Sequence, residues 1–199
     1  MIDQINNTQA IIRSKMQKIT NHNYDKVMTS DIVAHHIVHQ FNPSGTILEP
    51  CKGTGSFLKF LPNGTLWCEI DEGKDFFKFN EKVDWIITNP PYSLARDFMI
   101  HSFEISNNVV LLLPATKIFA SGGKMFGINQ YGGIKVIQFV KPKLCGFNFG
   151  WNVAIFHFQK DYRGMTQINY EFNKFEWLNQ IGTMPFYRCN ICNKVLRYK

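Results

Sequence analysis

The sequence lacks any long hydrophobic run. None of its apolar stretches approaches the ~18 residues of a membrane-spanning helix, although 45% of its 199 residues are hydrophobic. Residues 1–7 also lack the pattern of a secretory signal. Five cysteines, an odd number without regular spacing, form no disulfide framework and are typical of a reducing compartment. We therefore expect a soluble cytoplasmic protein with no membrane partner.

Acidic residues are scarce in the second half of the chain. Residues 1–104 carry 10 Lys and Arg against 12 Asp and Glu, whereas residues 105–199 carry 12 against 3, and none of these acids lies between Glu104 and Asp161. Such a stretch is either a solvated basic surface or a binding surface for a polyanion. Aromatic residues interleave the basic residues near the C-terminus, a composition that suits phosphates and bases. The predicted nucleic-acid contacts are Lys117, Lys124, Lys141, Lys143, Arg188, Lys194 and Arg197.

The most informative motif follows the apolar run 83–88, which predicts a buried parallel strand. Asn89, Pro90, Pro91 and Tyr92 come next. Prolines cannot extend a sheet ladder and hold the backbone near-extended, so the Asn89 amide oxygen and the Pro90 carbonyl become fixed acceptors. They lie at the carboxyl end of a strand, where open α/β sheets bind ligands. Two such acceptors suit an exocyclic amino group, and Tyr92 offers a flat face for its ring; an ordinary proline-stiffened turn is the alternative.

A second short apolar strand, 46–50, ends in Glu49 and Pro50 and leads into a glycine loop. Gly53 and Gly55 permit a tight turn and a close approach of backbone to ligand, and the apolar residues at 57–61 predict a helix after the loop.

A third strand, 66–71, contains Glu69 and Ile70. A carboxylate one βαβ step after a glycine loop can accept hydrogen bonds from ribose hydroxyls. Asp75 and Phe76 follow and place a carboxylate and a ring near a nucleobase.

These motifs, in this order, resemble those of S-adenosylmethionine-dependent DNA adenine-N6 methyltransferases over residues 24–160. LEPCKGTGSFL (48–58) resembles the cofactor loop of that family, CEID (68–71) its ribose-binding strand end, KDFF (74–77) its contact with the cofactor adenine and TNPPY (88–92) its catalytic motif. Thr29 matches an upstream Thr near the methionine carboxylate, and Cys51 with Lys52 departs from the usual small or apolar residues. The resemblance implies cofactor-binding roles for Thr29, Glu49, Pro50, Gly53, Gly55, Glu69, Ile70, Asp75, Phe76 and Asn89, and catalytic roles for Asn89, Pro90 and Tyr92.

The activity implied is transfer of a methyl group from S-adenosyl-L-methionine to the N6 amino group of adenine in DNA, after the base is flipped from the stack. RNA adenine-N6 and protein glutamine methyltransferases also use motifs like NPPY, and a nucleic-acid-binding subunit without catalysis is a further alternative. The Glu49-Pro50 strand end and Thr29 favour DNA.

The fold implied is α/β, class I methyltransferase-like (Rossmann-like), with a mostly parallel sheet, helices on both faces and an antiparallel edge hairpin. Helices are expected at 8–19, 30–41 and 94–103, a strand at 109–114 and a hairpin from 134–140 and 151–158. The 14 residues between Glu69 and Asp84 predict a shortened crossover. Glycines at 122–133 predict a mobile connection.

One compact methyltransferase domain is expected at 1–160, followed by a short basic extension at 161–199. A dedicated target-recognition domain usually needs on the order of 100 residues, so recognition uses loops or a second protein subunit. No metal is expected. His35 and His39 lack a third ligand, and Cys189 and Cys192 lack a second pair, so free thiols are expected there, with half of a zinc site as the alternative.

Overall fold

The computed structural model describes residues 27–140, 145, 152–169, 186–188 and 195–197. The helix expected at 8–19 lies outside these ranges, as do Lys141, Lys143, Lys194, Cys189 and Cys192.

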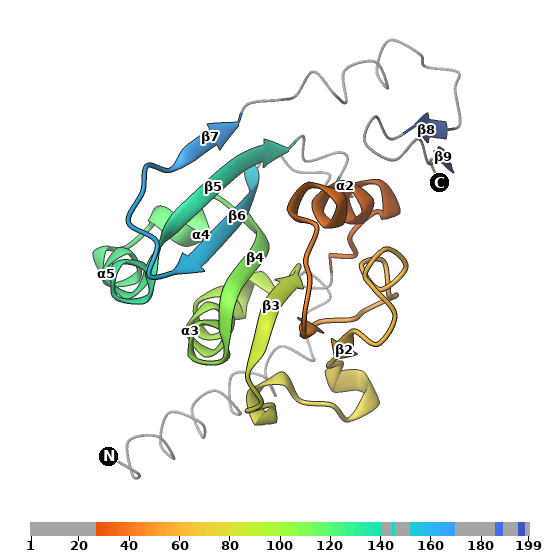
Figure 1. The fold of residues 1–199 in the computed structure, drawn as a ribbon, viewed down its shortest axis with the longest axis horizontal. Helices are drawn as coiled ribbons and strands as arrows, with labels where there is room; N and C mark the ends of the chain where they lie inside the picture. Colours follow the sequence, from red (N-terminus) through yellow and green to blue (C-terminus); the bar gives the residue numbers. More distant parts are fainter. Residues whose placement is uncertain (1–26, 141–144, 146–151, 170–185, 189–194, 198–199) are drawn as a thin grey trace.

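One mixed sheet organises the described residues (Figure 1). Its strand order is β2-β1-β3-β4-β6-β5-β7. The first four strands in this order run parallel, β6 is antiparallel to both neighbours, and β7 is parallel to β5. The strands are β1 (Ile47–Glu49), β2 (Leu66–Trp67), β3 (Val83–Thr88), β4 (Ser106–Pro114), β5 (Gly132–Val140), β6 (Val153–Lys160) and β7 (Gln167–Asn169). The predicted α/β class with a mostly parallel sheet and an antiparallel pair is confirmed, although β7 continues the sheet beyond the hairpin.

A separate two-stranded pair is formed by β8 (Phe186–Arg188) and β9 (Val195–Arg197). The division of the chain into domains at residue 160 stays a prediction.

Side chains of β6 contact helices on both faces of the sheet. The Phe156 ring contacts Phe119 of α4 (Thr116–Phe119), and the Phe158 ring contacts Phe103 of α3 (Ala95–Ile105). Successive strand side chains point to opposite faces. The intervening His157 accordingly contacts Phe41 of α2 (Asp31–Phe41), which covers the other face.

Helix α2 has the boundaries that the sequence predicts. The Ser30 hydroxyl accepts a hydrogen bond from the Val33 N–H at 3.4 Å, as an N-cap residue does. At the other end, Asn42 takes a left-handed conformation with φ of 41° and stops the helix. Helix α3 also forms as expected, after the short 3₁₀ turn η3 (Tyr92–Leu94).

Two local predictions are wrong. The helix expected after the glycine loop is a series of turns, because only isolated bonds such as Leu61 N–H to Phe57 O form before Pro62. The connection expected at 122–133 is the helix α5 (Gly122–Tyr131). Tyr131 anchors that helix: its ring stacks on Phe103 with centroids 4.0 Å apart, and its hydroxyl donates to Ser106 O. Tertiary packing therefore outweighs the low helix propensity of glycine.

The shortened crossover between β2 and β3 is confirmed. Two 3₁₀ turns, η1 (Ile70–Glu72) and η2 (Phe76–Lys78), replace the usual helix. Since β1, β2 and β3 are parallel, their carboxyl ends meet at one edge of the sheet, and the loops that follow them lie together there.

Candidate functional site

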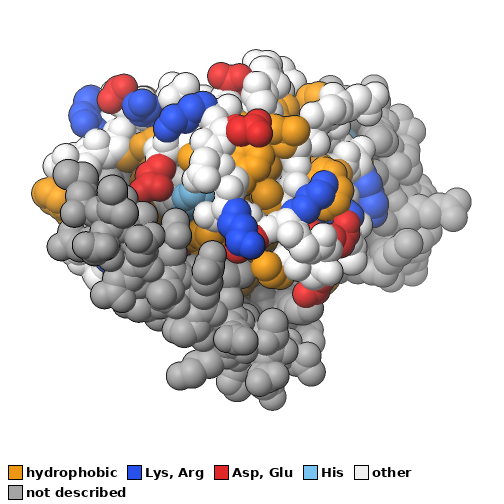
Figure 2. Space-filling view, turned by 90° about the horizontal axis from the view of Figure 1, so that it is seen from below, with side chains coloured by type: hydrophobic (Ala, Val, Ile, Leu, Met, Phe, Trp, Pro, Cys, Tyr) orange, Lys and Arg blue, Asp and Glu red, His pale blue; other side chains and the backbone are white. Residues whose placement is uncertain are grey.

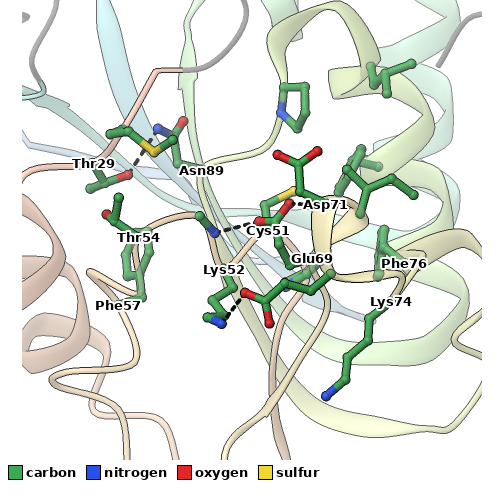
Figure 3. A pocket seen from close by; sticks show the side chains of 18 of the residues that line it. Thr29, Cys51, Lys52, Thr54, Phe57, Glu69, Asp71, Lys74, Phe76 and Asn89 are labelled. Carbon is green, nitrogen blue, oxygen red and sulfur yellow. Dashed lines mark hydrogen bonds and ion pairs between the residues drawn. The ribbon is translucent and has the colours of Figure 1, made fainter. Parts of the chain in front are cut away.

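A cavity of about 710 Å³ lies at the carboxyl ends of β1, β2 and β3. Its size falls within the roughly 300–1,000 Å³ of small-molecule and cofactor sites. Thr29 and Asn89 lie on one side of it, and Asp71, Lys74 and Phe76 on the other (Figure 3). The predicted residues that line it are Thr29, Pro50, Gly53, Glu69, Ile70, Asp75, Phe76 and Asn89.

Asn89 is held in one orientation by its amide nitrogen. Nδ2 donates to the backbone oxygen of Val27 at 2.9 Å and to the Thr29 hydroxyl oxygen at 3.0 Å. The Oδ1 atom is buried and has no hydrogen-bond partner among the described residues. A buried acceptor without a partner costs free energy, so this oxygen is poised to accept a hydrogen bond from a ligand. Thr29, predicted from the resemblance alone, thus bonds directly to the principal predicted catalytic residue.

Glu69 joins the glycine loop to the strand beside it. One carboxylate oxygen accepts the Gly53 N–H at 2.7 Å, and the other accepts the Asp71 N–H at 3.2 Å. Each oxygen of an ionised carboxylate can accept a second hydrogen bond. The side chain can therefore hold the loop and still accept from ligand hydroxyls in the cavity.

Gly53 and Gly55 have positive φ angles of 51° and 80°. The Lys52 carbonyl accepts the Gly55 N–H at 2.8 Å, so the tight turn forms in spite of the unusual Cys51-Lys52 pair. A Cβ on Gly53 would lie 3.2 Å from the sulfur of Met28, a cavity residue. Only glycine leaves this approach open.

Aromatic rings form the wall beside Asp75. The Asp75 carboxylate caps η2 by accepting the Phe77 N–H at 3.0 Å. The Phe76 ring stacks on Phe98 of α3, with centroids 4.9 Å apart and an interplanar angle of 22°. These rings and the free capacity of the Asp75 carboxylate suit a flat heterocycle that carries a donor.

Glu49 lies behind the cavity wall. Its side chain is 1% exposed, and burial raises its pKa to about 8, an effect that the nearby Thr88 hydroxyl and the hydrogen bond from the Cys51 N–H reduce only in part. Burial therefore favours the protonated, neutral form of this side chain. Burial also raises the pKa of the Cys51 thiol well above its ordinary value, with smaller contributions from the carboxylates of Glu49 and Glu69.

Four predicted site residues do not line the cavity: Glu49, Gly55, Pro90 and Tyr92. The Tyr92 side chain is 5% exposed and belongs to the hydrophobic core. Its predicted role in stacking on a base stays a prediction, and in this conformation the ring presents almost no free face.

Sequence reasoning missed a charged rim around Trp67. Lys74 and Lys52 place their Nζ atoms 3.3 Å and 4.2 Å from the centre of its ring, and Lys52 also forms an ion pair with Glu72. Both lysines and Glu72 line the cavity. Lys74 follows Trp67 by seven residues and Lys52 precedes it by 15, a spacing that matches no sequence pattern for a ligand-binding site.

The predicted nucleic-acid contacts fall into three groups. Lys117 lies in α4 and Lys124 in α5, whereas Arg188 and Arg197 belong to β8 and β9; Lys141, Lys143 and Lys194 lie outside the described residues. On the face shown in Figure 2, described Lys and Arg side chains lie beside Asp and Glu side chains. Charges of both signs therefore share that face.

Within the described ranges, no three His, Cys, Asp or Glu side chains are grouped as a metal site would require. In the same ranges, no helix combines the length and apolar character needed to cross a membrane.

No family model and no curated protein matches this chain by sequence. Solved structures do match. A protein from Listeria monocytogenes described as a class I S-adenosylmethionine-dependent methyltransferase has a TM-score of 0.54 at 14% identity, over 88% of this chain and 77% of that one. This chain has the class I methyltransferase fold.

Two further similar structures belong to type I restriction systems. The EcoKI M protein has a TM-score of 0.54 at 14% identity, over 71% of this chain and 45% of that one. The methyltransferase subunit from Streptococcus thermophilus has a TM-score of 0.52 at 12% identity, over 77% and 51%. The chain thus spans about half the length of either subunit.

Proposed function

We propose that this chain transfers a methyl group from S-adenosyl-L-methionine to the N6 amino group of adenine in DNA. The observation that carries the proposal is the buried Oδ1 atom of Asn89, which lacks a partner among the described residues and borders the cavity. An acceptor fixed beside a cofactor-sized cavity suits a substrate amino group whose hydrogens must be held while its nitrogen reacts.

The cavity residues fit the cofactor. S-adenosylmethionine supplies a methyl group on a positively charged sulfur, which needs no further activation. Glu69 would accept from the ribose hydroxyls, Asp75 and Phe76 would contact the adenine, and Thr29 would lie near the methionine end. Gly53 would leave room for close approach of the backbone, because a larger residue would be strained at its φ of 51° and would crowd the Met28 sulfur.

Asn89 would act by position and charge. Its two donated hydrogen bonds hold the amide so that Oδ1 accepts one amino hydrogen of the target, and the Pro90 carbonyl would accept the other. Both acceptors draw the nitrogen lone pair out of ring conjugation and stabilise the positive charge that develops during transfer. The proton then leaves to solvent, and no covalent intermediate with the protein is needed.

DNA is the proposed substrate, and a second protein subunit is the proposed source of target recognition. The two type I proteins above are the M protein of a restriction enzyme and a methyltransferase subunit of a restriction-modification system. The second of these is described as one subunit of its system, which supports a partner for this chain as well. We also propose a reducing, cytoplasmic setting, in keeping with the sequence.

The test is direct. The chain is incubated with methyl-labelled S-adenosylmethionine and, separately, with duplex DNA, RNA and a glutamine-containing protein substrate, and modified nucleosides and residues are identified by mass spectrometry. N6-methyladenine from DNA supports the proposal. Label only in RNA or in glutamine would move the activity to that substrate, and absence of cofactor binding with every substrate would leave a binding subunit.

A further inference from the structure

Three cations from three helices gather near the carboxyl end of β4. Arg96 is the second residue of α3, Lys117 the second of α4, and Lys124 lies in α5. The Lys124 Nζ atom donates to the backbone oxygen of Lys117 at 2.6 Å. Burial lowers the pKa of Lys124, and the charges of Lys117 and Arg96 lower it further. We refer to Arg96, Lys117 and Lys124 as the cationic cluster.

No carboxylate within the described ranges forms an ion pair with a member of this cluster, although Asp97 follows Arg96 in the sequence. The ion pairs found there are Lys52–Glu72, Lys59–Asp31 and His101–Glu104. The segment that forms α4 and α5 lies within the stretch from Glu104 to Asp161 that contains no acidic residue. Like charges held together without a counterion repel one another, and a bound polyanion would remove that repulsion.

The cationic cluster lies at the same edge of the sheet as Asn89. Strands β3 and β4 are parallel, with Thr88 opposite Leu111, so Asn89 lies level with the last residues of β4. Helix α4 begins two residues after Pro114, and α3 begins six residues after Asn89. In the strand order β2-β1-β3-β4, the loops after β1 and β2 supply much of the cavity lining, Leu94 and Phe98 add to it from the connection after β3, and Lys117 and Lys124 follow β4. A nucleic-acid strand bound at Asn89 therefore lies at the sheet edge that carries both the cofactor cavity and the cationic cluster.

Resting on the proposed function, we infer that the cationic cluster binds phosphates of the nucleic-acid strand that carries the target base. A nucleic-acid strand presents one phosphate per nucleotide and can reach cations on three helices, whereas a glutamine side chain brings no negative charge. Phe119 follows Lys117 on α4 and is 49% exposed, which offers an apolar ring to a neighbouring unstacked base.

The experiment measures binding of a fluorescein-labelled oligodeoxynucleotide, duplex and single-stranded, across a range of salt concentrations. The test protein is the full chain with Arg96→Gln, Lys117→Gln and Lys124→Gln combined. A matched control combines Lys78→Gln, Lys135→Gln and Lys160→Gln, three exposed lysines outside the cluster, so that both proteins lose the same charge. Thermal unfolding and affinity for S-adenosylhomocysteine are measured on each protein.

We expect the cluster variant to bind DNA more weakly, with the log–log salt slope reduced by about 0.9 for each lost phosphate contact on duplex and about 0.7 on single strands. The control variant and the affinity for S-adenosylhomocysteine should change little. A folded cluster variant with an unchanged slope would overturn the inference, and so would a control variant that loses as much. Wild-type protein that binds no oligonucleotide would also overturn it and would favour a protein partner.

The same measurements distinguish failure of the proposed function from failure of this inference. If wild type binds no cofactor and methylates nothing while the cluster variant alone loses DNA affinity, the phosphate-binding surface stands and the enzyme proposal fails.

Discussion

Replacing Glu69 by Gln should weaken cofactor binding, and the hydrogen bonds of its carboxylate indicate by how much. The carboxylate accepts from the Gly53 and Asp71 N–H groups, and an amide in its place would turn one NH₂ group toward a backbone donor. The variant also loses the charge that would accept from the ribose hydroxyls. A hydrogen bond to a charged group contributes about 1.5–3 kcal/mol, which corresponds to roughly a 10-fold to 150-fold loss of affinity.

Isothermal titration calorimetry with S-adenosylhomocysteine measures this loss, and Glu72→Gln is the matched control. Glu72 lines the same cavity, but its side chain is 45% exposed and pairs with Lys52. An exposed ion pair contributes only about 0–1 kcal/mol, so the control should lose no more than a few-fold. Equal affinities of Glu69→Gln and wild type, in a protein that unfolds normally, would refute the role given to Glu69.

Three further outcomes are expected. Gly53→Leu should abolish cofactor binding without unfolding the protein, because its side chain would enter the cavity beside Met28; calorimetry that shows binding intact would contradict the loop geometry. Tyr92→Ala should lower stability by about 3–5 kcal/mol because the ring is buried. Tyr92→Phe should stay folded and keep much of its methylation activity. A folded but inactive Tyr92→Phe would contradict a role for the ring alone. Burial lowers the pKa of His157 from 6.5 to about 4, so its contribution to the free energy of unfolding is complete above pH 6.5 and is lost as the pH falls toward 4, by about 3 kcal/mol in total. Chemical denaturation of wild type and His157→Phe across this pH range should show a steeper loss of stability in wild type. Parallel plots of stability against pH for the two proteins would refute this.

The fold class and the strand-end residues of the candidate site could be predicted from the sequence, whereas the long-range packing around them could not. Strands, glycine turns and strand-end acids are local patterns, so Gly53, Glu69 and Asn89 could be placed at one sheet edge before the structure was known. The bond between Asn89 and Thr29, 60 residues apart, was beyond local reasoning and came only from family resemblance.

The features that local patterns did not predict depend on long-range contacts. Stacking of Tyr131 on Phe103 makes a helix of a glycine-rich segment, and no local pattern encodes that contact. Burial of Tyr92 depends on packing in the core, which a motif does not report. The cationic cluster likewise joins residues from three helices, so the charge bias of the sequence indicated Lys117 and Lys124 but gave no reason to add Arg96.

The most direct test of the central claim is single-turnover methylation of adenine in DNA by wild type and Asn89→Ala, with cofactor affinity measured on the same preparations. Removing a fixed acceptor of developing charge typically costs about 10²–10³ in rate. The account predicts N6-methyladenine from wild type, a loss of at least this size in Asn89→Ala, and cofactor affinities within a few-fold of each other. Equal rates for the two proteins, or a wild-type product other than N6-methyladenine, would contradict it.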